Sequence, residues 1–161
     1  MVFNIVFALF SLILENIFNL YLNEFKYFYP LFTLISLIII YPNFKDNKKN
    51  YFIFSFILGL IYDLFFTNFY ILNPILFLII SIIIYYIFSY KEYNIKTIII
   101  TSILIIFIYN LMLYLILNFF NYTNYNILEF SNILKCFLLG NTLYIILSYF
   151  ILKNTYFLHK L

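Results

Sequence analysis

Three charged residues lie inside stretches of this sequence that are otherwise apolar: Glu15 in LILENIF, Asp63 in GLIYDLFF and Lys135 in NILKCFL. A charge at the centre of a membrane helix costs about 2.5 to 3.5 kcal/mol, so each of these side chains is expected to have a polar partner or a shifted protonation state. We predict that the three share a polar cluster, in which Asp63 and Lys135 form the favoured pair.

The spacing of polar and small residues supports an interior position for both acids. Residues three or four positions apart lie on one face of a helix, and small or polar residues on such a face pack and hydrogen-bond against other helices. One predicted face carries Asn4, Ala8, Ser11, Glu15 and Asn19, and another carries Ser55, Gly59, Asp63 and Thr67. Both faces are therefore expected to point towards protein.

Three roles are open for the acids. They can be structural, joining helices to one another, or they can shape a surface where a partner protein docks. They can also couple the movement of a proton or a substrate, which is a frequent use of carboxylates inside membranes. Gly59 by itself indicates a point of close helix packing.

No set of residues in the sequence fits a catalytic, cofactor or metal site. His159 and Cys136 are the only histidine and cysteine, and there is no glycine-rich loop that would hold a phosphate. We therefore expect no enzyme activity and no cofactor. The net charge is only +3, and the basic residues are lysines in predicted loops, which argues against nucleic-acid binding.

The composition is that of an integral membrane protein. Of the 161 residues, 66% are hydrophobic and 9% are charged, and the mean hydropathy is +1.05, whereas soluble domains carry about 25% charged residues. The apolar runs are continuous rather than alternating, which favours helices over a barrel. The sequence thus predicts one all-α membrane domain over residues 1–161, with a first span that is retained rather than cleaved.

Six spans are predicted in this domain, because a helix crosses the hydrocarbon in roughly 20 residues. The second is the weakest, since its residues rise only about 22 Å at 1.5 Å per residue. The predicted spans are residues 2–22, 28–42, 50–67, 73–90, 97–119 and 131–152.

The lysines predict the orientation. Most of them fall on the side that holds both termini, in the 43–50 loop, the 91–96 loop and the C-terminal tail. Because cytoplasmic loops carry the excess of Lys and Arg, both termini are expected in the cytoplasm. The residues on this side are Lys45, Lys48, Lys49, Lys91, Lys96, Lys153 and Lys160.

The stretch GLIYDLFF resembles the family of bacterial rod shape-determining proteins called MreD. In that family a hydrophobic helix ends in Gly-x-x-x-Asp-Leu, which Gly59, Asp63 and Leu64 match here. An acidic residue within the first span, here Glu15, and the order of six spans in about 160 residues are also similar. The family usually has Leu-Gly in the turn after the Asp, where this chain has ILNP at 71–74.

The resemblance implies a non-catalytic scaffold of the cell-elongation machinery in the bacterial inner membrane. Such a protein would bind the bitopic protein MreC and help couple MreB filaments to peptidoglycan synthases. The implied fold is a six-helix bundle similar to the substrate-capture subunits of energy-coupling-factor vitamin transporters, and such a subunit is the main alternative function. A proton-coupled carrier using Glu15 and Asp63, with symmetry supplied by a homo-oligomer, is a third.

Overall fold

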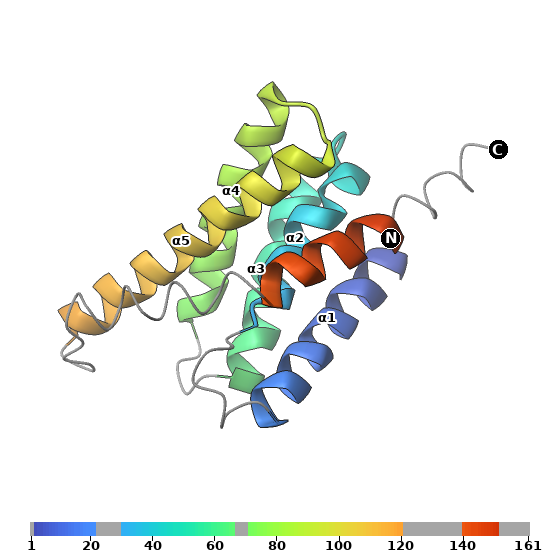
Figure 1. Ribbon diagram of the computed structural model, residues 1–161. Coiled ribbons are helices and arrows are strands. Elements are labelled where there is room, and N and C mark those ends of the chain that lie inside the picture. The colour runs from blue at the N-terminus through green and yellow to red at the C-terminus, as the bar shows by residue number, and fades with distance from the viewer. Residues whose placement is uncertain (1, 22–29, 67–70, 121–139, 152–161) are drawn as a thin grey trace.

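The computed structural model describes residues 2–21, 30–66, 71–120 and 140–151, and these residues form helices and the turns between them, without a strand among them. The labelled elements are α1 (Val2–Tyr21), α2 (Phe32–Ile40), a 3₁₀ helix η1 (Tyr41–Phe44), α3 (Lys48–Phe66), α4 (Leu72–Tyr90) and α5 (Ile95–Phe119). A further helix, Gly140–Ile151, is drawn in red in Figure 1. The all-α prediction is confirmed for this part of the chain.

Within the described residues, four helices are long and apolar enough to cross a membrane: α1, α3, α4 and α5. Two shorter apolar helices, Phe32–Phe44 and Gly140–Ile151, lie below that length. The predicted sixth span, 131–152, is described only from residue 140 onward. A multi-pass membrane protein is therefore compatible with the structure, while the crossing of all six segments stays a prediction.

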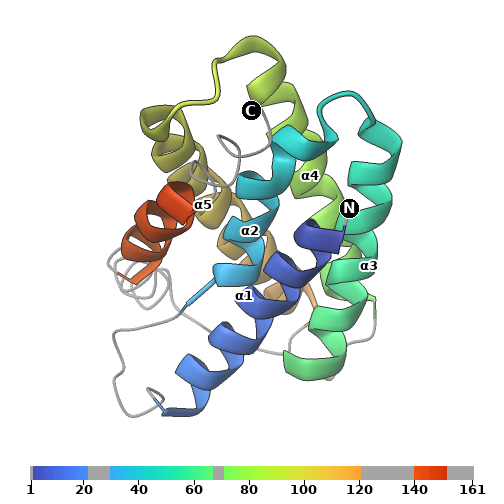
Figure 2. The same cartoon turned by 90° about the vertical axis from the view of Figure 1, so that its right-hand side faces the viewer.

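Helix α2 lies at the centre of the bundle. Every one of its residues is buried, and Figure 2 shows it surrounded by the longer helices. Its nine residues rise only about 14 Å, which is the physical basis of the weak second span. Backbone that leaves the helix at membrane depth is tolerated where protein rather than lipid surrounds it, and Pro30 and Leu31, just before α2, are buried.

The turns that carry lysines lie at one end of the bundle. The amide of Asn43 donates to Asn4 Oδ1, which joins the turn after α2 to the start of α1. The hydroxyl of Tyr93 donates to the carbonyl of Ile39 at 2.9 Å, which joins the turn between α4 and α5 to the end of α2. Figure 1 shows both turns at the end where the N-terminus lies.

The predicted polar faces point largely inward. On α1 and α3 the residues that line these faces are buried, and the opposite sides carry exposed large apolar residues suited to lipid. Asn19 is only half buried, because it lies in the last turn of α1. Thr67 lies outside the described residues. The buried set is Asn4, Ala8, Ser11, Glu15, Ser55, Gly59 and Asp63.

Candidate functional site

Asp63 binds the start of the neighbouring helix. Its carboxylate accepts hydrogen bonds from the backbone N–H of Asn73 at 3.2 Å and from the Asn73 side-chain amide at 2.6 Å. Asn73 is the second residue of α4, where backbone N–H groups have no partner within the helix. Ile71, at the cap position of α4, makes no side-chain cap. Asp63 therefore caps α4 from outside that helix.

Gly59 makes this cap reachable, because it lets α3 touch the backbone of α4. A Cβ atom at position 59 would lie 2.6 Å from Pro74 Cα and 2.8 Å from the Asn73 carbonyl oxygen. Real Cβ atoms do not approach backbone that closely, so any side chain here would separate the two helices. Gly59 and Asp63 are one turn apart on the same face of α3, and together they hold the Asn73–Pro74 step.

Glu15 caps α2 in the same way. Its carboxylate accepts from the backbone N–H of Thr33 at 2.8 Å and from the hydroxyl of Tyr62 at 2.7 Å. Thr33 is the second residue of α2, and Leu31, at the cap position, makes no side-chain cap. Glu15 is completely buried, so its two donors stabilise a group that lipid or apolar protein would otherwise exclude.

The backbone that leads into α2 is bound by the last described helix. The N–H of Leu31 donates to Asn141 Oδ1 at 2.9 Å, and the N–H of Ile35 donates to the Leu31 carbonyl at 3.1 Å. The start of α2 thus takes acceptors from α1 and from the helix Gly140–Ile151. Inside a bilayer, backbone N–H and C=O groups must find their hydrogen-bond partners within the protein, and these contacts supply them at the start of α2.

Two tyrosines connect the capping carboxylates. Tyr62 donates to Glu15, and Tyr109 on α5 donates to Asn73 Oδ1 at 2.7 Å. The hydroxyls of Tyr62 and Tyr109 are neighbours. A buried row of polar groups therefore runs from Glu15 to Asp63 and contacts all five labelled α-helices.

The chemistry of this polar row is structural in the described part of the chain. Glu15 and Asp63 accept hydrogen bonds from backbone and amide N–H groups at helix starts, and Glu15 also accepts one from the hydroxyl of Tyr62. The described part of the chain includes no group of three metal-binding side chains. The structure brings Glu15, Gly59 and Asp63 to helix contacts in one interior. Lys135 lies outside the described residues, so its pairing with Asp63 stays a prediction.

The partners of the two acids were not predicted from the sequence. Asn73 carries the one available signal, an amide directly before Pro74 near a helix start. Tyr62 and Tyr109 are two of 18 tyrosines, and spacing alone does not separate buried ones from those in the interfacial belt. Thr33 contributes its backbone N–H, which sequence does not distinguish from any other.

Comparison of this chain with models of known protein families, with curated proteins and with solved structures finds no match. The functional argument therefore rests on the residues and their geometry, together with the resemblance described above.

Proposed function

We propose that this protein is a non-catalytic membrane scaffold of the bacterial cell-elongation machinery, similar to MreD. It would lie in the inner membrane with both termini in the cytoplasm. A bitopic MreC-like protein would be its direct partner, and MreB filaments and wall synthases would be linked through the same complex.

One observation carries the proposal. The residues by which the chain resembles the family, Gly59 and Asp63, act as one unit that fixes the start of α4. This is a structural use of the motif, because the carboxylate accepts hydrogen bonds from the backbone and the side chain of Asn73 at the start of the next helix. A helix start fixed in this way supports a role in presenting a docking surface.

The experiment is a pull-down of the tagged full-length protein from its native cells in mild detergent, with mass spectrometry of the captured proteins. The scaffold proposal expects an MreC-like protein and wall synthases. Capture of a pair of ATPases with a coupling subunit would instead identify a vitamin-capture subunit and contradict the proposal.

Two variants make the test specific to Asp63. Asp63→Asn keeps the shape of the side chain and one acceptor oxygen, but loses the second acceptor. We expect it to reach the membrane at the wild-type level and to recover less of the partner. Asn16→Leu is the matched control, because Asn16 is half buried on α1. If both variants recover as much of the partner as the wild type does, and cells with Asp63→Asn keep a normal rod shape, Asp63 has no role in partner docking.

A further inference from the structure

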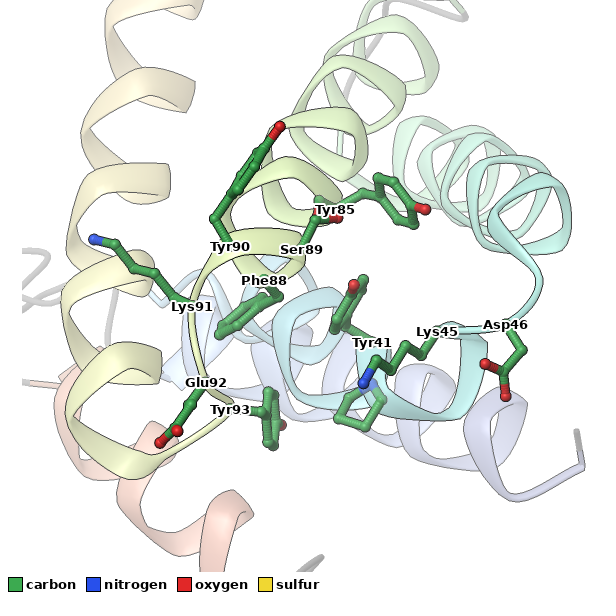
Figure 3. A pocket seen from close by; sticks show the side chains of 11 residues that line it. Tyr41, Lys45, Asp46, Tyr85, Phe88, Ser89, Tyr90, Lys91, Glu92 and Tyr93 are labelled. Atoms are coloured by element: carbon green, nitrogen blue, oxygen red, sulfur yellow. The ribbon is translucent and has the colours of Figure 1, made fainter.

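A cavity of about 670 Å³ opens at the end of the bundle that carries the lysine-bearing turns. Figure 3 shows that its walls come from the turn after α2, the last turns of α4 and the turn between α4 and α5. Its lining includes Lys45, Tyr41, Tyr85, Phe88, Tyr90 and Tyr93.

Aromatic rings packed on one another form the walls of the cavity. Tyr41 and Phe88 stack with ring centres 5.3 Å apart, and Phe88 packs against Tyr93 at 5.2 Å. The rings of Tyr85 and Tyr41 pack edge to face, with their centres 6.1 Å apart. Contacts of this kind hold rings in place, so the cavity is built rather than formed by loose loop ends.

Several donors at the cavity have no hydrogen bond or ion pair within the described part of the chain, among them the ammonium group of Lys45 and the hydroxyl of Tyr85. The Lys91 ammonium and the Tyr90 hydroxyl are others, and Figure 3 shows both pointing away from the group. Figure 3 shows the Lys45 side chain pointing towards the middle of the group, beside Tyr41. The carboxylates of Asp46 and Glu92 lie at opposite edges and point outward. The cavity therefore offers the positive charge of Lys45 near its middle and the hydroxyl donor of Tyr85 on its wall, which suits an anion.

The position of the cavity indicates where that anion comes from. Tyr86 and Tyr90, in the last turns of α4, are 60% and 86% exposed, and exposed tyrosines at helix ends mark the boundary between hydrocarbon and water. The turns at this end carry an excess of positive charge, which attracts anionic lipid surfaces. Their charged residues are Lys45, Lys48, Lys49, Lys91 and Lys96 against Asp46 and Glu92.

We propose that this cavity binds the phosphate headgroup of an anionic glycerophospholipid, of which phosphatidylglycerol is the simplest. Lys45 and Tyr85 donate to the phosphate oxygens, and the rings of Tyr41, Phe88 and Tyr93 cover the glycerol and the first methylene groups. A tyrosine-lined cavity at headgroup depth meets a lipid phosphate directly. The proposal stands independently of the scaffold role.

The test is a titration of the purified full-length protein in detergent, with bound ligand counted by native mass spectrometry. The ligands are dioctanoyl phosphatidylglycerol, dioctanoyl phosphatidylcholine and inorganic phosphate. We expect phosphatidylglycerol to bind roughly tenfold more tightly than the other two, because the choline cation of phosphatidylcholine offsets the phosphate charge beside Lys45, and inorganic phosphate lacks the glycerol and methylene groups that the rings cover. Lys45→Ala and Tyr85→Phe are each expected to weaken it roughly tenfold.

The matched control is Lys96→Ala, which removes the same charge from an exposed position at the same end without lining the cavity. We expect it to bind phosphatidylglycerol like the wild type. An equal loss in Lys96→Ala would show diffuse attraction to charge and overturn the site. Equal binding of phosphatidylcholine, or of phosphate alone, would overturn the assignment of an anionic lipid. The unfolding temperature of each variant without lipid separates lost binding from lost folding, and Tyr85→Phe keeps the ring contacts.

Discussion

The pair α1–α2 and the pair α3–α4 each place a carboxylate on the first helix so that it caps the second residue of the next. They differ in the acid and in what lies one turn before it. Asp63 follows Gly59, which brings α4 against the backbone of α3. Glu15 follows Ser11, which bonds to Phe7 and to Tyr144 of the last helix instead.

The difference suggests that the length of the acid is matched to the approach of the helices. The shorter Asp lies where glycine permits close contact, and α3 and α4 make the most extensive contact among the labelled elements. The longer Glu reaches a helix that no glycine brings closer. Glu15 also accepts a hydrogen bond from Tyr62 on a third helix. The Glu15 site therefore joins three helices: α1, α2 and α3.

The largest effect is expected from Glu15→Leu. This change leaves the Thr33 N–H and the Tyr62 hydroxyl buried without an acceptor, at a cost of roughly 2 to 6 kcal/mol in the free energy of unfolding. Denaturation of the purified protein in mixed micelles measures it. Asn16→Leu, one residue further along α1, is the control and should change stability little. Similar losses in both variants would show that Glu15 does not hold α2.

Gly59→Ala tests the other half of the comparison. The added methyl group meets the backbone of Asn73 and Pro74, so α3 and α4 must separate, and overpacking of this kind costs roughly 1 to 3 kcal/mol. Ser55→Ala, one turn earlier on the same face, loses only a bond to the carbonyl of Phe52 and is the control. If Gly59→Ala unfolds at the wild-type temperature, the contact is looser than the structure has it.

A double-mutant cycle shows whether the two capping sites act together. Tyr62→Phe removes a bond to a carboxylate, with an expected loss of roughly 1.5 to 3 kcal/mol, and Tyr109→Phe removes a neutral bond to Asn73, with a loss of about 1 kcal/mol. Because the two hydroxyls are neighbours, we expect the losses to be non-additive by about 0.5 kcal/mol or more. Strict additivity would mean that the sites are independent.

The smallest effect is expected from Thr33→Val. The hydroxyl of Thr33 lies beside the Glu15 carboxylate but does not meet the geometry of a hydrogen bond to any described residue. Its backbone N–H, which valine retains, is the group that Glu15 caps. Replacement of the hydroxyl by a methyl group should change the free energy of unfolding by less than about 1 kcal/mol. A larger loss would show that the hydroxyl also binds Glu15.

The sequence predicts which helix faces are buried, but it does not predict which residues form hydrogen bonds with one another. The faces that carry Glu15 and Asp63 follow from helical periodicity, because polar residues among apolar ones mark the side that avoids lipid. The caps do not follow from it. A carboxylate in a helix can meet any donor at its depth, and here the donors are backbone groups of Thr33 and Asn73. The sequence predicts a short second span over 28–42, and the nine-residue α2 lies within it, but its central position depends on how the other helices pack.

The bond between Leu31 and Asn141 has a consequence for the order of assembly. The two residues are 110 positions apart, so the backbone N–H of Leu31 does not have this acceptor until Asn141 has been synthesised. Before then the segment must stay near the membrane surface, where water can serve the same amide. The innermost helix of the bundle is therefore among the last to be locked into place.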